Sequence, residues 1–269
     1  MANAPTKAEI TRKCEEGFAV AQQHFARVIC CEKKGDDPAK PVSAASGVNV
    51  SWQGKSCVLT CHHVIKADPF VPVRNLASNT PRQSPDFKQF QKAATVSCSD
   101  KTIDLALLHD PDRSDLPNGA IYDLSWSEGV TRELLARNLG ALTAFCGAWN
   151  EPSDVTPLGA DQIFGSTVLY AACGPLVEVS DDLLFADFRE ETVFRENRQD
   201  FPDQLAGKSF GRGKSRNLDG VSGTGLWIPF GGRWVLAGIL LGPKGEIGDP
   251  VIRFRPIWRI LDRLRVNCV

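Results

Sequence analysis

Long apolar runs are missing from this chain of 269 residues. No stretch approaches 18 uninterrupted apolar residues, so no membrane-spanning helix is expected. The first 13 residues contain no apolar core and do not predict a secretory signal. The net charge is only −1 at neutral pH, so the composition gives no reason to expect binding to nucleic acid or to an anionic membrane surface.

Paired cysteine motifs are also missing. The chain has nine cysteines, an odd number, and no two of them have the CxxC spacing. Most lie in apolar surroundings, as in the segment Val28–Cys31. Reduced, buried thiols explain this pattern better than a disulfide framework, and they favour a cytoplasmic location.

The two ends of the chain have helical patterns. Thr6 and Glu9 have the spacing of a capping box, and the apolar residues after them predict a helix over residues 6–23. Gly17 inside this helix costs about 1 kcal/mol relative to Ala. After a proline, an apolar stripe predicts a C-terminal helix over residues 256–266.

Between these helices the chain has short apolar runs separated by Gly, Pro, Asn and Asp. This pattern predicts an all-β fold instead of βαβ units. A helical interruption over residues 127–139 divides the β region into two halves. Residues 75–92 and 181–216 are too polar for strands, and the second of these segments begins acidic and ends basic. Segments of this length are expected to be loops, often functional ones.

Histidine is scarce, with four residues, which narrows the search for a catalytic base. His62 and His63 follow a strand-like run that ends at Thr60, a place where a base is held rigidly and is open to substrate. Asp104 stands at the head of an apolar run. It is either a solvated residue before an edge strand or a buried carboxylate that orients an imidazole.

Gly220-Val-Ser-Gly-Thr-Gly225 places a serine among three glycines. One interpretation is an ordinary tight turn, because glycine serves wherever φ must be positive. The other is a nucleophile turn, in which the N–H groups of Gly220 and Ser222 bind an oxyanion while the Ser222 hydroxyl attacks.

The order of these residues along the chain excludes two hydrolase architectures. An α/β-hydrolase needs a histidine after its nucleophile, and no histidine follows His109. A subtilisin-type order needs the aspartate first, but only Asp36 and Asp37 precede His63, in a polar loop. The order His, Asp, Ser remains.

Three segments resemble the trypsin/chymotrypsin family of serine proteases, most closely its bacterial, disulfide-free peptidases. Thr60-Cys-His-His-Val64 resembles the family's Thr-Ala-Ala-His-Val segment, which selects His63 as the base. Asp104–Leu108 resembles its Asp-(Ile/Leu)-Ala-Leu-Leu segment. Gly220–Gly225 resembles its Gly-x-Ser-Gly-Gly-Pro turn, with Thr-Gly in place of the final Gly-Pro.

The resemblance implies two six-stranded β-barrels of the chymotrypsin type, with helices at both ends of the chain. Residues 1–24 are then an N-terminal extension and residues 25–269 a peptidase domain. The first barrel is expected over about residues 25–125 and the second over about residues 140–255. The catalytic triad would lie in the cleft between them.

The implied activity is that of a serine endopeptidase with the triad His63, Asp104 and Ser222. It needs no metal and no cofactor, and its substrate is a protein or peptide, here a restricted intracellular target. The alternative is a catalytically inactive binding module with the same fold. A metal site built from Cys57, Cys61 and the two adjacent histidines is disfavoured, because these thiols lack the spacing of structural zinc ligands.

The resemblance also gives tentative substrate-binding residues. Arg216, six residues before the nucleophile, corresponds to the base of the family's S1 pocket, where a cation would favour an acidic P1 side chain. The alternative is a solvated basic loop. The segment Trp234–Gly242 resembles the strand that pairs with substrate backbone, which assigns Ile239, Leu240 and Leu241 to substrate binding.

The residue before the nucleophile is Val221, where the family's zymogen switch uses an aspartate. That ion pair is therefore not available for activation. The N-terminal helix and the segment 181–216 are the candidate docking sites for a regulatory partner.

Overall fold

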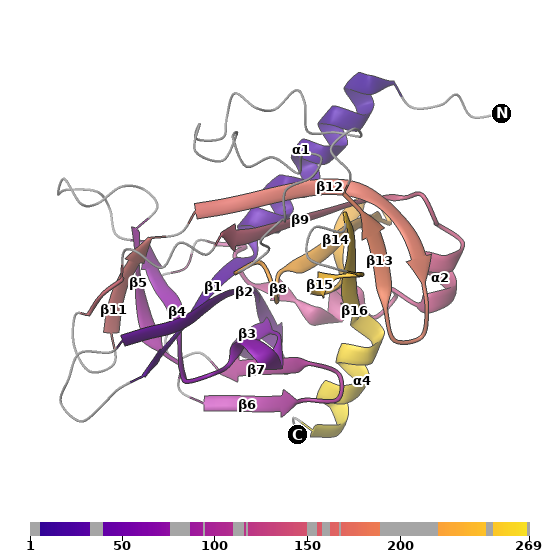
Figure 1. Cartoon of the computed structure of the whole chain (residues 1–269). Helices are drawn as coiled ribbons and strands as arrows, with labels where there is room; N and C mark the ends of the chain where they lie inside the picture. The colour runs from indigo at the N-terminus through magenta and orange to yellow at the C-terminus, as the bar shows by residue number, and fades with distance from the viewer. Residues whose placement is uncertain are drawn as a thin grey trace.

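The architecture is mostly β. The computed structural model describes residues 6–32, 40–75, 87–93, 95–109, 116, 118–149, 155–157, 162–166, 168–188, 220–245 and 250–267. Within them, a curled sheet and a closed barrel lie side by side, with one helix at each end of the chain (Figure 1).

The first half of the chain forms most of a ten-stranded sheet. Its strands are β1 (Phe25–Glu32), β2 (Lys40–Trp52), β3 (Lys55–Thr60), β4 (Asp68–Asn75), β5 (Phe87–Lys92), β6 (Thr95–Asp100), β7 (Leu105–His109), β8 (Tyr122–Asp123), β10 (Val155–Pro157) and β11 (Gln162–Ser166). They pair in the order β10-β11-β5-β4-β1-β2-β3-β7-β6, and β8 pairs with β2.

Among the described residues this sheet does not close, whereas the sequence predicted a six-stranded barrel here. A small barrel would close only if β6 paired with β5. Both edges of β5 are occupied, because β5 pairs with β4 on one side and with β11 on the other. The hairpin β10–β11 therefore extends the sheet beyond β5.

The second half forms a closed six-stranded barrel, as predicted. Its strands are β9 (Leu142–Trp149), β12 (Val168–Val179), β13 (Leu184–Asp187), β14 (Gly225–Phe230), β15 (Arg233–Pro243) and β16 (Val251–Pro256). They pair in the order β12-β13-β16-β15-β14-β9, and β9 pairs back with β12. Alternate side chains fill the barrel, and Phe145, Leu240 and Phe254 are among those with no solvent exposure.

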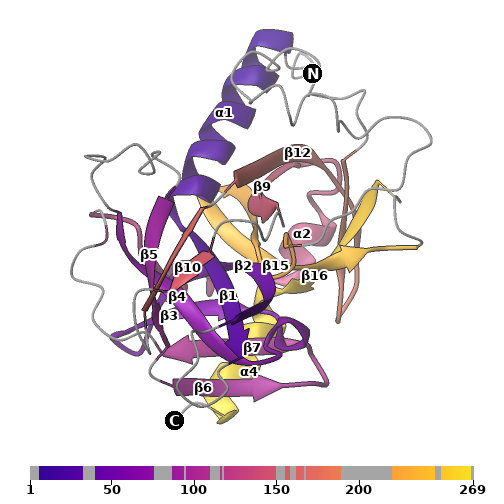
Figure 2. The ribbon, with the colours of Figure 1, turned by 60° about the vertical axis from the view of Figure 1, so that its left-hand side comes forward.

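The N-terminal helix α1 (Lys7–Gln23) matches the expected helix within one residue. Both capping-box bonds between Thr6 and Glu9 are present. The helix lies along the outside of the barrel, against β9, β12 and β14 (Figure 2). At the point of contact, a Cβ on Gly17 would stand 2.7 Å from the Cβ of Ala144 and 2.7 Å from the Cη2 of Trp234. Glycine therefore permits the close approach.

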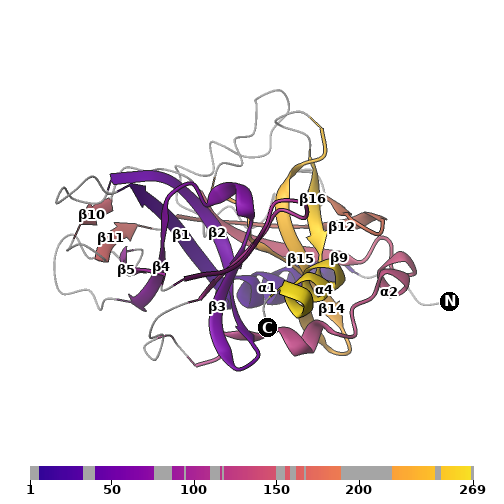
Figure 3. The same cartoon turned by 90° about the horizontal axis from the view of Figure 1, so that it is seen from below.

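The C-terminal helix α4 (Ile257–Asn267) continues directly from β16. It lies near the junction of the sheet and the barrel when the molecule is seen from below (Figure 3). Three short helical segments complete the described chain: η1 (His62–Val64), η2 (Leu124–Ser127) and α2 (Arg132–Ala136). None of the helices in the described residues combines the length and the apolar character that crossing a membrane requires.

Two segments expected to be loops contain strands. Residues 87–92 form β5, although their sequence is polar, because backbone hydrogen bonds to two neighbouring strands define a strand regardless of side chain. Residues 184–187 form β13 of the barrel. Residues 189–216 of the second segment lie outside the described residues.

Candidate active site

His63 and Asp104 are hydrogen-bonded to each other. His63 lies in η1, immediately after β3, and Asp104 lies immediately before β7, which pairs with β3. The Nδ1 of His63 is 2.7 Å from the Oδ2 of Asp104, and the backbone N–H of His63 donates to Oδ1 at 2.9 Å. The His63 side chain is 46% exposed, so the ring is fixed on one side and open to solvent on the other. The neighbouring His62 places its Nδ1 against the hydroxyl of Ser99 instead.

The backbone of Asp104 has a positive φ of 54°. This left-handed conformation costs about 1–3 kcal/mol for a residue other than glycine, although Asp tolerates it better than most. The hydrogen bonds from His63 hold the residue from one side. From the other side, the Nε of Arg255 donates to the carbonyl of Ile103 at 2.8 Å.

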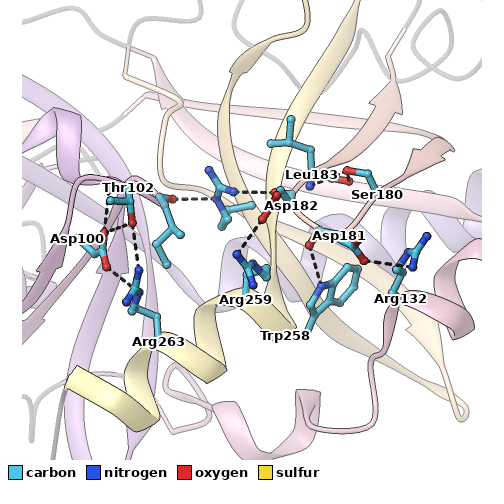
Figure 4. Close-up of polar contacts among 12 residues, drawn as sticks. Asp100, Thr102, Arg132, Ser180, Asp181, Asp182, Leu183, Trp258, Arg259 and Arg263 are labelled. Carbon is cyan, nitrogen blue, oxygen red and sulfur yellow. Dashed lines mark hydrogen bonds and ion pairs between the residues drawn. The ribbon is translucent and has the colours of Figure 1, made fainter.

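Helix α4 supports the same turn. Arg263 forms an ion pair with Asp100 at 2.7 Å and donates to the Thr102 hydroxyl at 3.1 Å (Figure 4). Asp100 in turn accepts hydrogen bonds from the backbone and the hydroxyl of Thr102. The turn that presents Asp104 is therefore held by side chains of β16 and α4, which belong to the second half of the chain.

Asp104 is suited to remain ionised. Burial by itself would raise its pKa, but the hydrogen bonds from the ring and the backbone of His63 outweigh burial, and the pKa is lowered. An ionised carboxylate at this position accepts the Nδ1–H of His63 and leaves Nε2 unprotonated, which is the tautomer a general base needs.

Ser222 lies in a tight turn that leads into β14. Gly220 and Gly223 have φ values of 90° each, which only glycine adopts without strain. A Cβ on Gly223 would meet the carbonyl of Ser46, the hydroxyl of Thr60 and, at 3.2 Å, the backbone nitrogen of Cys61. The turn therefore packs against the segment that ends two residues before His63.

The N–H groups of Gly220 and Ser222 donate to no other group in the part of the chain that the structure describes. Both lie in the same turn as the partly exposed Ser222 side chain. Two free N–H groups beside a hydroxyl are what an oxyanion-binding turn requires.

Ser46 of β2 connects this turn to both halves of the molecule, and sequence reasoning missed it. Its N–H donates to the Ser222 carbonyl at 3.0 Å, and its hydroxyl donates to the Gly220 carbonyl at 2.6 Å. The same hydroxyl accepts the N–H of Ala148 in β9 at 2.8 Å. No local signal marks it, because β2 contains further polar residues, such as Ser43 and Asn49, and the partners of Ser46 are distant in sequence.

Thr224, where the resemblance to the protease turn ends, is accommodated by the barrel. It is 1% exposed, and its hydroxyl donates to the carbonyl of Cys146 in β9. Its backbone N–H donates to Val221 at 3.1 Å, and its carbonyl accepts the N–H of Leu240 at 2.8 Å. A threonine therefore anchors the end of the turn to two barrel strands.

The structure thus brings Ser222, His63 and Asp104 into one region, but only two of them are in direct contact. His63 and Asp104 are hydrogen-bonded to each other. No hydrogen bond links the Ser222 hydroxyl to His63 in the described structure. Bonds between nucleophile and base are often long or poorly aligned without substrate.

The candidate substrate-binding residues have different environments. Ile239 and Leu240 are fully buried, and the backbone of Leu240 is bonded to Gly223 and Thr224 of the nucleophile turn. Leu241 is partly exposed and is the extra residue of a bulge between β15 and β16. Arg216 lies outside the described residues.

Three neighbouring side chains carry atoms that could bind a metal ion, and these side chains are hydrogen-bonded to protein groups. Donor atoms of Cys61, His63 and Asp104 lie within 4.8 Å of one another. The thiol of Cys61 donates to the Leu240 carbonyl at 3.1 Å, and burial raises its pKa well above the ordinary value. Since thiolates and not thiols bind metals, this arrangement fits a bonded His–Asp pair beside a structural thiol.

No protein-family model matches the chain, and no curated protein is similar enough to count as a relative.

Proposed function

We propose that this protein is a serine endopeptidase of chymotrypsin-type architecture. The observation that carries the proposal is the double hydrogen bond between His63 and Asp104, next to a glycine turn that presents Ser222 and two N–H groups without an acceptor among the described residues. The closed barrel, the curled sheet and the terminal helices are consistent with that architecture. In it, the curled sheet corresponds to the first barrel.

The proposed reaction is acyl transfer through Ser222. His63 takes the proton of the Ser222 hydroxyl as that oxygen attacks the peptide carbonyl, and then gives a proton to the leaving amine. Asp104 fixes the ring of His63 and stabilises its protonated form. The N–H groups of Gly220 and Ser222 stabilise the negative charge on the tetrahedral intermediate. Water then hydrolyses the acyl-enzyme by the same steps.

An intracellular protein or peptide substrate is part of the proposal. It is supported by the eight cysteines that lie in the described residues, all of which are buried and outside disulfides. A regulatory partner on α1 is also proposed, because α1 packs against β14, the strand that the nucleophile turn leads into. In the other candidate segment, Asp181 and Asp182 are ion-paired with Arg132 and Arg259, so these two acids support the fold.

The test is active-site labelling. A fluorophosphonate probe is expected to label the wild-type protein at a single serine, and Ser222→Ala is expected to abolish labelling and to reduce kcat on peptides by about 10⁶. His63→Ala should abolish labelling, while the matched His62→Ala should retain it, because only His63 contacts Asp104. A folded wild-type protein that is not labelled would be a binding module instead.

A further inference from the structure

Arg253 is an arginine of β16 whose side chain projects from the outside of the barrel. Its two neighbours in the strand, Ile252 and Phe254, are fully buried in the barrel core. Arg253 and Arg255 therefore lie on the opposite face of the strand. That face is directed toward the catalytic pair, because Arg255 reaches the carbonyl of the residue before Asp104.

The guanidinium of Arg253 has no hydrogen-bond or ion-pair partner among the described residues, although its Nε is shielded from solvent. Two other cations of this region are paired. Lys244 is 2.6 Å from Glu178, and Arg259 is 3.0 Å from Asp182. A partly buried charge without a partner is unfavourable, and an anion bound there would compensate it.

Arg253 is also close to the nucleophile turn. It is adjacent to Phe254, which pairs with Leu240, and Leu240 is bonded through both backbone groups to the Ser222 turn. Consecutive Cα atoms are about 3.8 Å apart and paired ones at most about 5.5 Å, so the Cα of Arg253 lies within about 9 Å of the Cα of Leu240. Arg253 is therefore a near neighbour of the residue whose backbone is hydrogen-bonded to the nucleophile turn.

Gly242 leaves the space beside the guanidinium open. It pairs with Arg253, and a Cβ placed on it would be 3.9 Å from the Nη2 of Arg253. With φ at 149°, this position favours glycine. The partly exposed Leu241 precedes it. The strand segment where substrate backbone is expected to pair thus borders an unpaired guanidinium.

We propose that Arg253 makes this protein selective for an acidic P1 residue, Asp or Glu, the residue whose carbonyl Ser222 attacks. The inference rests on the proposed peptidase function and specifies its substrate class. A guanidinium offers two parallel N–H groups to a carboxylate, a geometry that neither an amide nor an apolar side chain reproduces.

The test compares isosteric peptides. Quenched fluorescent peptides that differ only in P1, Glu against Gln and Asp against Asn, are assayed with the wild-type enzyme. The acidic member is expected to have a kcat/KM about 10–100-fold higher. Arg253→Gln should bring the ratio near 1, and Arg253→Glu should favour Lys or Arg at P1. Arg233→Gln, at the other end of β15, is the matched control and should keep the wild-type ratio.

A second measurement needs no variant. Product peptides ending in Glu should protect Ser222 of the wild-type enzyme from fluorophosphonate labelling at lower concentration than peptides ending in Gln. Equal protection would contradict the inference.

Two further outcomes would overturn it. The first is cleavage of the peptides without acidic preference. The second is an acidic preference that survives Arg253→Gln; its loss in Arg216→Gln would then assign it to Arg216. In both cases the endopeptidase stands, because peptides are still cut. If the wild-type protein neither cuts peptides nor reacts with the probe, the proposed function fails and the inference fails with it.

Discussion

Individual side chains at this site form hydrogen bonds that connect segments distant in sequence. Ser46 is the clearest case, because one hydroxyl serves the nucleophile turn and the barrel strand β9 together. It is fully buried and touches no substrate in the proposed mechanism, so it is a positioning residue. Its effect on activity should therefore appear as a change in the reactivity of Ser222.

We predict that Ser46→Ala destabilises the protein and slows labelling of Ser222. The carbonyl of Gly220 and the N–H of Ala148 would both lose a buried partner, which costs about 2–4 kcal/mol in total. A displaced turn should lower the labelling rate between about 10- and 100-fold. Urea unfolding and probe kinetics measure the two effects.

Ser127→Ala is the matched control for this prediction. Ser127 is also fully buried, and its hydroxyl bonds Leu236 at 2.8 Å and Tyr122 at 2.9 Å, away from the nucleophile turn. It should lose comparable stability and keep the wild-type labelling rate. If both variants slow labelling equally, Ser46 has no special role in positioning.

At the scale of elements, helix α1 depends on a residue that its own propensity disfavours. Gly17 lowers the intrinsic stability of the helix, but it lets the helix approach β9 and Trp234 closely. Cys14, three residues earlier, is buried in the same contact beside Cys173 of β12. Tertiary packing therefore decides which residue stands at position 17.

We predict that Gly17→Ala destabilises the protein, although alanine is the better helix former. The added Cβ would stand 2.7 Å from two carbon atoms of the barrel, and overpacking of this kind costs about 1–3 kcal/mol. Thermal or urea unfolding measures the loss. At the exposed position 19, Ala19→Gly should cost only the propensity difference of about 1 kcal/mol. A stabilised Gly17→Ala protein would show that α1 does not dock as described.

The terminal helices and the β character follow from local patterns, but the pairing of strands does not. The capping box at Thr6 and the apolar stripe after Pro256 are local signals, and both helices are present. The polar segment 87–92 is a strand only because two other strands bond to it. Likewise, β10 and β11 follow β9 in sequence but join the other sheet, which depends on contacts that no local pattern contains.

The same division holds at the site. The motifs around His63, Asp104 and Ser222 are short and local, so they were identifiable from sequence. The sequence does not show that Arg255 supports Asp104, or that Arg253 has no partner among the described residues, because both facts depend on which side chains lie across a strand or a sheet. From sequence alone, an arginine in a strand is equally compatible with a hydrogen-bonded side chain and with an unpaired one.

At the scale of the whole molecule, stability should depend on pH through buried groups. His24, at the end of α1, is 6% exposed, stacks on Trp227 and bonds the Ala120 carbonyl through Nδ1 at 3.1 Å. Burial lowers the pKa of His24 below its ordinary value of 6.5. The unfolded chain therefore binds this proton at a higher pH than the folded protein does.

We predict that the free energy of unfolding is highest above about pH 6.5 and falls as pH decreases toward the folded pKa of His24. One proton changes the slope by at most about 1.4 kcal/mol per pH unit. Asp100 and Asp104, whose pKa values are lowered, should cause a second loss below about pH 3.8. Urea unfolding across this range measures both. His24→Asn should flatten the first loss and leave the second; an unchanged profile in this variant would exclude His24 as its source.

The excursion of the chain through β10 and β11 has a consequence for synthesis on the ribosome. Among the described residues, the outer edge of β5 is covered by β11 alone, which ends at Ser166, after the first barrel strand β9 has already been made. Until that point the nascent sheet carries an unpaired edge, which is a site for mispairing between neighbouring chains. The two β halves therefore fold as one unit. The nucleophile turn is translated after β11, so it meets a sheet whose edge is already covered.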